Sequence, residues 1–417
     1  MKTEIINIGT ELLMGMIVNT NGAYLAKECT KLGFGVYYQS VIGDNPERIA
    51  EAIEIASSRA DLILITGGLG PTEDDITKET VAKVFGKTLI EDETVKNNIR
   101  GLFAKREWND VPNNNWKQAQ VIEGAVVLHN PLGTAPGFIL EAKNKTIVML
   151  PGPPREMIPM VEEQVVPYLK KKQDTVFITK MVKLCGITES AVAEKIEDLV
   201  GNQTNPTIAT YAKEGEVHIR VTASGVNKTE AKKLVKPVVK ELKTRFGLDV
   251  YTTDEEETLE TCVVKMLAKH ELTMVTAESC TGGMIAATIV NVPGASNVLK
   301  ESFVTYSNKA KKKYLDVSKA TLKKYTEYSD KCAKEMTKGA ALLHDSDVSI
   351  AVTGLAGPGG GTEEKPVGLV YIGCYVKGKV TVKEFRFHGD RSMIRNLAVV
   401  NGLDLLRRCL IAQYENE

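Results

Sequence analysis

Residues 272–290 decide the fold of the C-terminal part of this chain, and their centre reads Ala277-Glu278-Ser279-Cys280-Thr281-Gly282-Gly283. Residues 272–276 predict a buried strand and residues 284–290 predict a helix. A strand–turn–helix junction places backbone N–H groups at the turn, where they can bind an anion or a developing oxyanion. The turn also carries a hydroxyl and a thiol that can act as nucleophiles, those of Ser279 and Cys280. A tight packing turn explains these residues equally well, so the stretch alone leaves both interpretations open.

Further candidate groups follow this turn along the chain. Residues 309–313 hold four lysines, which are typical of a solvated helix face, but a lysine buried beside a serine loses its proton and can act as a base. A predicted strand, 349–353, opens into Gly354-Leu355-Ala356-Gly357-Pro358-Gly359-Gly360-Gly361. Six of these eight residues are glycine or proline, so the loop has few side chains to pack. Because it follows a strand of an α/β segment, we favour a loop shaped around a ligand over a disordered one. Arg391 is suited to a phosphate or carboxylate, although a surface ion pair is the commoner role of such an arginine.

The composition indicates a globular protein of two or three domains, because 43% of the 417 residues are hydrophobic. Lys plus Arg and Asp plus Glu both number 53, so the net charge gives no support for a polyanionic partner. The seven cysteines form no Cys-x-x-Cys pair, and we expect a reducing, cytoplasmic location. The five histidines show no metal-ligand spacing, and no apolar run approaches the length of a membrane span.

The N-terminal part alternates predicted strands, 4–8, 36–42 and 62–65, with predicted helices, which indicates a mainly parallel sheet. The third strand runs into a glycine-rich loop, 66–77, whose glycines let a phosphate or pterin-like ligand approach the backbone. Glu73, Asp74 and Asp75 in this loop offer oxygen ligands to Mg²⁺ or a similar ion. For any single one of them, an acidic first turn of the next helix is the simpler explanation.

Two further glycine- and proline-rich turns, 130–138 and 150–157, accompany this loop, and three such turns favour one composite pocket. Residues 176–246 then predict a small α+β module with a KH-type pattern. This module lacks the Gly-x-x-Gly loop that clamps nucleic acid, so we expect a structural or dimer-forming role. An acidic segment, 254–257, marks the next boundary, and the predicted domains are 1–172, 173–252 and 253–417.

Taken together, these motifs resemble the CinA family over essentially the whole chain. The front part is similar to the molybdopterin-binding MogA/MoaB fold, through Gly9-Thr10-Glu11-Leu12-Leu13, Asn19-Thr20-Asn21, the 67–77 loop, Gly133-Thr134-Ala135-Pro136-Gly137 and Pro151-Gly152-Pro153-Pro154. The back part is similar to the PncC nicotinamide mononucleotide amidase, through 277–283, 293–296, Tyr306-Ser307-Asn308 with Lys311, 353–361 with 363–368, and Gly389-Asp390-Arg391. The resemblance implies an α/β protein: a three-layer α/β domain, a small α+β KH-type module and a C-terminal α/β amidase domain.

The amidase resemblance implies that nicotinamide mononucleotide is hydrolysed to nicotinate mononucleotide and ammonia without a cofactor. It implies Lys311 as general base, Ser279 or Ser296 as nucleophile, and Tyr306 as the residue that orients them. Backbone N–H groups near Gly282 and Gly294 would bind the oxyanion, and Arg391 with the 357–361 loop would bind the phosphate. The expected substrate-binding positions in this domain are Gly282, Gly283, Gly294, Thr353, Gly357, Gly359, Gly360 and Arg391.

The front domain is associated in this family with metal-dependent ADP-ribose pyrophosphatase activity. The resemblance implies a divalent ion, Mg²⁺ or similar, held by Asp74, Asp75 and Glu11, with substrate contacts at Gly67, Gly68, Gly70 and Thr72. We expect small-molecule nucleotides as partners, a homodimer, and no direct binding of nucleic acid. The alternative is a pterin-binding or competence-related scaffold protein without catalysis.

Overall fold

A computed structural model of the chain describes residues 1–105, 110–172 and 175–414. The chain divides into two compact units, residues 1–178 with 224–231 and residues 179–223 with 232–417, and each is described by itself. The boundary predicted between residues 172 and 173 adjoins residues 173–174, which lie outside the described ranges.

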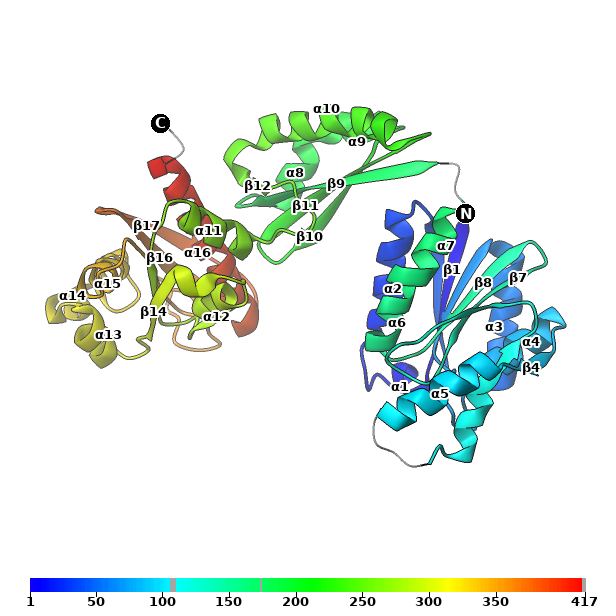
Figure 1. The fold of residues 1–417 in the computed structure, drawn as a ribbon. Helices are drawn as coiled ribbons and strands as arrows, with labels where there is room; N and C mark the ends of the chain where they lie inside the picture. Colours follow the sequence, from blue (N-terminus) through cyan, green and yellow to red (C-terminus); the bar gives the residue numbers. More distant parts are fainter. Residues whose placement is uncertain (106–109, 173–174, 415–417) are drawn as a thin grey trace. The chain divides into compact units, whose positions relative to one another are not determined.

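The first unit is a three-layer α/β domain (Figure 1). Its central sheet has the order β2-β1-β3-β8-β7-β6. These strands are β1 (Lys2–Ile8), β2 (Gly35–Ile42), β3 (Leu62–Thr66), β6 (Val126–Leu128), β7 (Gly137–Ala142) and β8 (Lys145–Leu150). The pairs β1/β2, β1/β3 and β3/β8 are parallel, whereas β6 and β7 pair antiparallel. The prediction of a mainly parallel sheet is therefore confirmed for β2, β1, β3 and β8. The remaining strands, β7 and β6, form an antiparallel edge.

Helices cover both faces of this sheet because alternate strand residues point to opposite sides. Ile6 and Ile63 face a core shared with helices α3 and α4, while Ile5 and Leu64 face a second core with α2 and α6. The helices are α1 (Thr10–Leu13), α2 (Thr20–Lys31), α3 (Pro46–Arg59), α4 (Thr77–Phe85), α5 (Glu93–Lys105), α6 (Pro154–Met160) and α7 (Val166–Lys170). Shorter elements are β4 (Leu89–Glu91), β5 (Gln120–Ile122), the 3₁₀ helix Asn113–Ala119 and the π-helical turn Val161–Val165.

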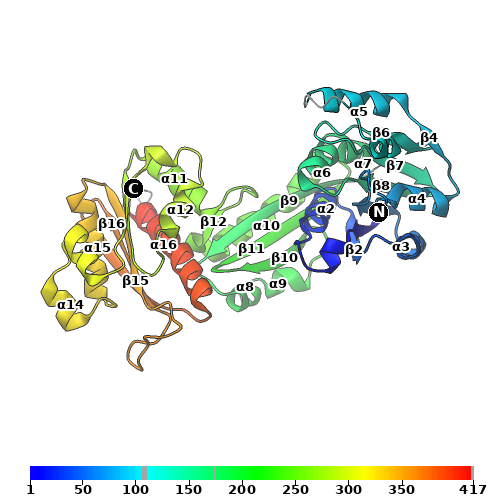
Figure 2. The ribbon, with the colours of Figure 1, turned by 90° about the horizontal axis from the view of Figure 1, so that it is seen from below.

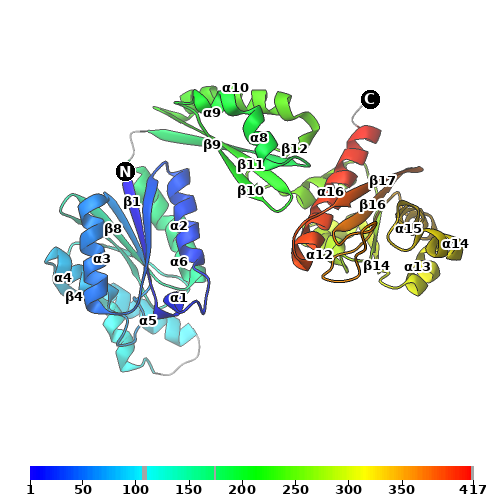
Figure 3. The same cartoon turned by 180° about the vertical axis from the view of Figure 1, so that it is seen from behind.

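The middle module is a four-stranded sheet of order β10-β11-β9-β12, with helices on one side (Figures 1 and 3). Its strands are β9 (Val176–Cys185), β10 (Thr207–Lys213), β11 (Glu216–Gly225) and β12 (Val250–Thr252). Its helices are α8 (Glu189–Lys195), α9 (Glu197–Gly201), α10 (Lys228–Phe246) and a 3₁₀ turn, Gly247–Asp249. The sequence predicted one helix over residues 189–200, but Ile196 leaves helical geometry, at φ −118° and ψ 9°, and divides it.

The C-terminal domain is a five-stranded sheet of order β14-β13-β15-β16-β17, in which β13 pairs parallel with β14 and β15 and the other pairs are antiparallel. The strands are β13 (Met274–Glu278), β14 (Leu299–Val304), β15 (Val348–Gly354), β16 (Leu369–Val376) and β17 (Lys379–Arg386). The helices are α11 (Leu259–Lys269), α12 (Met284–Val290), α13 (Asn308–Leu315), α14 (Lys319–Tyr325), α15 (Asp330–Leu343) and α16 (Arg391–Tyr414), with a 3₁₀ turn at Ala295–Asn297. Helices α11, α12 and α16 share one core with the sheet, and α13 and α15 share the other.

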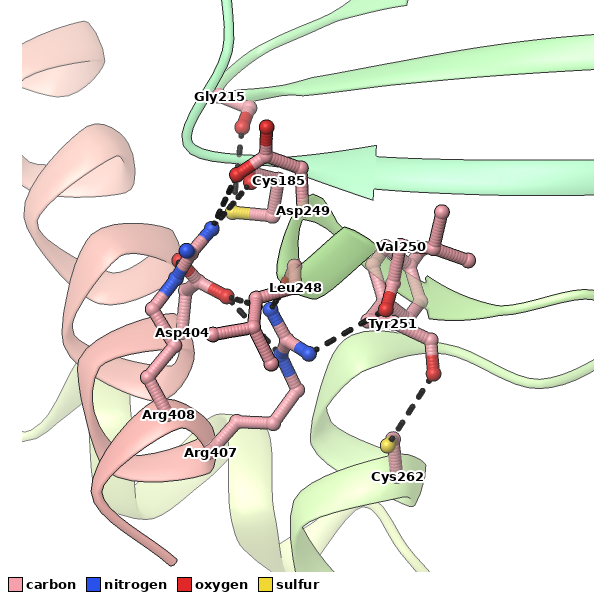
Figure 4. A network of polar contacts seen from close by, with 10 residues as sticks. All are labelled: Cys185, Gly215, Leu248, Asp249, Val250, Tyr251, Cys262, Asp404, Arg407 and Arg408. Atoms are coloured by element: carbon pink, nitrogen blue, oxygen red, sulfur yellow. Dashed lines mark hydrogen bonds and ion pairs between the residues drawn. The ribbon is translucent and has the colours of Figure 1, made fainter. Parts of the chain in front are cut away.

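Helix α16 packs along β16 (Figure 2) and also joins the domain to the middle module (Figure 4). Arg407 donates to the Leu248 carbonyl at 2.6 Å and to Asp404 at 2.6 Å. Arg408 donates to the Cys185 carbonyl and to Asp249, each at 2.9 Å, and also binds Asp404 at 2.6 Å. Because Asp404 and Arg407 are buried, this ion-pair network fixes the helix against the module.

Candidate functional site

A cavity of about 220 Å³ lies at the carboxyl ends of β13 and β15 and beside the residues that follow β14. Parallel strands bring their carboxyl ends to one edge of a sheet, which is where open α/β sheets bind ligands. The lining residues are Ser279, Cys280, Tyr306, Tyr328, Gly354, Leu355, Ala356, Gly357, Gly359, Gly360 and Arg391. The edge of the sheet thus collects half of the residues predicted for this site, namely Ser279, Tyr306, Gly357, Gly359, Gly360 and Arg391.

The side chains of Ser279 and Lys311 meet in this site. Lys311 Nζ lies 2.9 Å from Ser279 Oγ and donates to the Thr305 carbonyl at 2.8 Å. Lys311 has no exposed surface, although it belongs to α13, a helix with several solvated lysines. Burial lowers the pKa of its ammonium group, because a charged form is poorly solvated inside the protein. A neutral Lys311 amine can accept the proton of the Ser279 hydroxyl, which activates that oxygen as a nucleophile.

The turn that presents Ser279 is held by Glu278, a residue that the sequence did not single out. The buried Glu278 carboxylate accepts from the N–H groups of Gly283, Ile285 and Ala286 at 2.9, 3.1 and 2.9 Å. It therefore caps the first turn of α12 from the strand side. The sequence signal for this role is the position of Glu278 at the end of a buried strand, directly before Ser279. A carboxylate in such a position needs hydrogen-bond donors nearby, because burying it without them is costly.

Arg395, one turn into α16, holds the same turn from the other side. Its guanidinium donates to the carbonyls of Cys280 and Thr281, each at 3.0 Å. Gly282 and Gly283 have φ of 63° and 95°, a left-handed conformation that favours glycine and lets the chain pass from β13 into α12. Arg395 has no local signal in the sequence, because it lies more than a hundred residues after the carbonyls that it binds.

Tyr306 and Arg391 also meet at the cavity. Arg391 Nη1 donates to the Gly357 carbonyl at 2.6 Å, and its Nη2 donates to the Tyr306 hydroxyl at 3.2 Å. The guanidinium thereby fixes the glycine-rich loop, in which Gly359 and Gly360 line the cavity. Tyr328, which the sequence analysis missed, adds a second aromatic ring to the wall.

Other predicted residues have different surroundings. Thr353 is buried, and its hydroxyl donates to the Glu327 carbonyl at 2.7 Å instead of lining the cavity. Ser296 is exposed on the 3₁₀ turn after Gly294, and neither residue is among those that line the cavity. The serine that the structure brings into hydrogen-bond contact with Lys311 is therefore Ser279.

The predicted oxyanion donor at Gly282 needs correction. The Gly282 N–H donates to the Ser279 carbonyl at 3.1 Å, and the Gly283 N–H is bound by Glu278. Along the described chain, no backbone carbonyl accepts from the N–H groups of Cys280 and Thr281. The Cys280 side chain is buried, and burial raises the pKa of its thiol to about 11, so it is a poor nucleophile beside an activated serine.

A second cavity, of about 390 Å³, lies at the carboxyl ends of β1, β3 and β8 in the N-terminal domain. All three predicted loops contribute to it, as one composite pocket requires. Its lining includes the predicted residues Glu11, Gly67, Gly68, Gly70, Asp74 and Asp75, together with Asp44, Gly133, Arg155 and Glu156. Thr72 does not line it but donates through its N–H to Asp75 at 2.9 Å.

Of the acidic residues of this cavity, Asp74 and Asp75 lie in the loop before α4, which begins at Thr77, so they are not the first turn of that helix. Hydrogen bonding from the Thr72 hydroxyl lowers the pKa of the exposed Asp74, which stays ionised. In the described part of the chain, no three His, Cys, Asp or Glu side chains already converge as a metal-binding group. Mg²⁺ commonly uses one or two carboxylates, substrate phosphates and water, so Asp74 and Asp75 fit such an ion when a diphosphate is bound.

Comparison with known proteins matches three family models along the chain. Residues 4–171 match a probable molybdopterin binding domain, residues 179–252 match the damage-inducible protein CinA KH domain, and residues 256–410 match the CinA C-terminal domain. A Clostridium beijerinckii protein named among the competence-damage inducible proteins is 53% identical over 411 residues, which are 99% of this chain and all of that protein. The chain belongs to the CinA family.

Two further proteins are similar to this chain. A CinA-like protein of Dictyoglomus turgidum is 49% identical over 99% of this chain and all of its own length. Among solved structures, the competence/damage inducible protein CihA of Agrobacterium tumefaciens is 38% identical over 36% of this chain and 92% of its own, with a TM-score of 0.36. The family models and the observed sheets confirm the predicted three-part α/β architecture of this CinA protein. Within the described ranges, no helix combines the length and apolar character that crossing a membrane requires.

Proposed function

We propose that this CinA-family protein is a hydrolase whose C-terminal domain deamidates nicotinamide mononucleotide to nicotinate mononucleotide and ammonia. The observation that carries the proposal is the buried Lys311 amine, 2.9 Å from the Ser279 hydroxyl at the edge of a cavity. A serine hydroxyl paired with a buried lysine amine is suited to acyl transfer, in which the serine oxygen attacks the carbonyl carbon of an amide. The nicotinamide identity comes from the family resemblance, and the site chemistry is compatible with it.

In the proposed reaction, Lys311 accepts the Ser279 proton while the oxygen attacks the carboxamide carbon. The N–H groups of Cys280 and Thr281, held in place by Arg395, supply the oxyanion donors in place of Gly282. Collapse of the tetrahedral intermediate breaks the C–N bond, and Lys311 returns the proton to the departing nitrogen, which leaves as ammonia. Water then hydrolyses the acyl-enzyme by the same route and releases the nicotinate product.

Two features of the cavity support a nucleotide as the substrate. The Arg391 guanidinium, held by Gly357 and Tyr306, is a donor suited to the phosphate. The rings of Tyr306 and Tyr328 in the wall are suited to an aromatic base. Glycines in the 357–361 loop leave room for the sugar and phosphate.

The test is to incubate the purified protein with nicotinamide mononucleotide and measure ammonia and nicotinate mononucleotide by chromatography, without added metal. Ser279→Ala should abolish ammonia release, and the matched Ser296→Ala variant should retain it. Retained activity in Ser279→Ala together with loss in Ser296→Ala would assign the attack to the other serine. Absence of product from the wild-type protein would overturn the amidase.

For the N-terminal domain we propose metal-dependent hydrolysis of the ADP-ribose diphosphate. The support is a cavity at the sheet edge that is lined by the glycine-rich loop and by Asp74 and Asp75. A divalent ion bound there would neutralise the diphosphate charge and so favour attack by water. Adenosine monophosphate should form from ADP-ribose with Mg²⁺ and not with a chelator, and Asp75→Asn should reduce its formation. Metal-independent product would contradict this assignment.

A pterin-binding or competence-related scaffold is the second candidate. It is supported by the glycine-lined cavity of the N-terminal domain, where a pterin-like ligand can approach the backbone. If neither substrate is converted while a pterin binds the purified protein, this candidate replaces the hydrolase. We also propose a homodimer, which light scattering of the eluting protein would test.

A further inference from the structure

A strained turn, residues 325–329, joins α14 to α15 beside the cavity of the C-terminal domain. Tyr328 of this turn lines the cavity. Thr326, two residues earlier, has φ 67° and ψ 174°, a backbone conformation that is essentially restricted to glycine. A β-branched residue stays in such a conformation only where its surroundings hold it, and strain of this kind is concentrated at active sites and ligand clamps.

Lys365 holds this turn from the loop that follows β15, residues 355–368, which we call the cavity loop because five of its residues line the cavity. Lys365 Nζ donates to the Tyr325 carbonyl at 2.8 Å and to the Thr326 hydroxyl at 2.6 Å. The Lys365 backbone is itself fixed, because its N–H donates to the Thr362 hydroxyl and its carbonyl accepts from the Thr362 N–H. The two ammonium contacts are charge-assisted, so they bind the cavity loop firmly to the turn.

Glu327 connects the same turn to two further elements of the site. Its carbonyl accepts from the hydroxyl of Thr353, near the end of β15, at 2.7 Å. Its carboxylate accepts from the side chain of Asn308 at 3.3 Å, and Asn308 belongs to α13, the helix that carries Lys311. The cavity loop, β15 and α13 therefore all contact this one turn.

We propose that Lys365 is a positioning residue of the amidase site, which fixes the cavity loop against the turn so that the loop backbone and the Tyr328 ring form a preset pocket for the nucleotide. The identity of that nucleotide rests on the proposed function. Lys365 is not among the residues that line the cavity, so it acts through these two walls. The contacts of Glu327 do not involve Lys365, so the Ser279–Lys311 pair keeps its place without the Lys365 amine. Lys365 therefore contributes to substrate binding by preorganisation and not to the chemical step.

The first test is Lys365→Met, which keeps the apolar stem and removes the amine. Steady-state ammonia release from nicotinamide mononucleotide should show KM raised about tenfold, with kcat within about twofold of the wild type. Lys365→Arg, which still offers donors to both oxygens, should restore most of the affinity. Lys323→Met is the matched control, because Lys323 is an exposed lysine of α14, and it should leave KM unchanged. An unchanged KM in Lys365→Met, or a fall in kcat alone, would overturn the proposal.

A second measurement separates this inference from the amidase activity, because amide hydrogen exchange of the full-length protein needs no substrate. Lys365→Met should speed exchange about tenfold in residues 325–329 and 355–368 together, while residues 277–283 keep the wild-type rate. If these two segments respond but the wild type releases no ammonia, the positioning role stands and the amidase fails. Wild-type exchange in either segment, or faster exchange throughout the domain with a lower Tm, would overturn the positioning role.

Discussion

Replacement of Lys311 by methionine is the sharpest test of the Ser279–Lys311 pair. Methionine keeps most of the apolar length of this fully buried side chain but removes the amine that contacts Ser279 and Thr305. Loss of a positioned general base costs about 10²–10⁴-fold in turnover. We expect a fall of that size in ammonia release from nicotinamide mononucleotide, with a smaller change in KM because the amine does not bind the phosphate.

The same substitution changes how stability depends on pH. Burial lowers the Lys311 pKa in the folded protein, whereas in the unfolded chain the pKa is about 10.4. Between these two values the unfolded chain binds a proton that the folded protein does not, so the free energy of unfolding of the wild type rises with pH. The slope relative to Lys311→Met reaches about 1.4 kcal/mol per pH unit, and it vanishes below the folded pKa. For a domain of this size, that corresponds to roughly 3–5 °C in Tm per pH unit.

The assay compares thermal unfolding of the wild type and of Lys311→Met across the alkaline range, with ammonia release measured on the same samples. Lys312→Met is the matched control, because Lys312 is the next residue of α13 and is exposed. The control should show neither the loss of turnover nor the pH-dependent difference. A stability difference that stays constant up to about pH 10, or near-normal turnover, would refute a neutral Lys311 base.

Four further predictions concern the surroundings of the site. Arg391→Met should raise KM for the nucleotide about 10–100-fold at similar kcat, since it removes a charge-assisted phosphate contact, and an unchanged KM in steady-state kinetics would contradict this. Arg395→Met should instead lower kcat about 10-fold or more, because the turn that supplies the oxyanion donors loses two hydrogen bonds; equal kcat values would count against it. Glu278→Gln should lower the free energy of unfolding by about 2 kcal/mol in urea, because three backbone N–H groups lose their carboxylate, and a wild-type midpoint would speak against the cap. Asp404→Asn should cost about 3 kcal/mol in the same assay by leaving the buried Arg407 without its partner, whereas a neutral effect would show that the network contributes little.

The sequence allowed residues of the proposed amidase site to be named, but it did not separate their roles. Ser279, Tyr306, Lys311 and Arg391 were each recognised from a motif. The sequence does not show which of Ser279 and Ser296 contacts the lysine, because both are compatible with the motifs. Only the structure shows that Lys311 Nζ lies 2.9 Å from Ser279 Oγ. The burial of Lys311 could not be predicted, because its neighbours in sequence are solvated lysines. Its burial follows from the packing of α13 on the core of the domain.

The supporting groups were harder to foresee for a physical reason. Glu278 and Arg395 act through hydrogen bonds to backbone atoms, and such bonds leave no pattern of side chains in the sequence. In the N-terminal domain, the three glycine- and proline-rich turns indicated one pocket, and the structure brings them together. Asp44, which follows β2, and Glu156, in the first turn of α6, were not singled out, because nothing local in the sequence marks either carboxylate as facing the pocket.

The sequence by itself determined the strand–turn–helix around residues 277–283 and the alternation of strands and helices, because hydrophobic period and glycine spacing are local properties of the chain. The family was recognised from the resemblance of its motifs, which are also local stretches of sequence. The tertiary structure alone decided which strands pair antiparallel, which serine meets the buried lysine, and which loops meet at the N-terminal cavity. These outcomes depend on how sheet edges and helices pack over long sequence separations, where the burial of an amine or a thiol changes its chemistry.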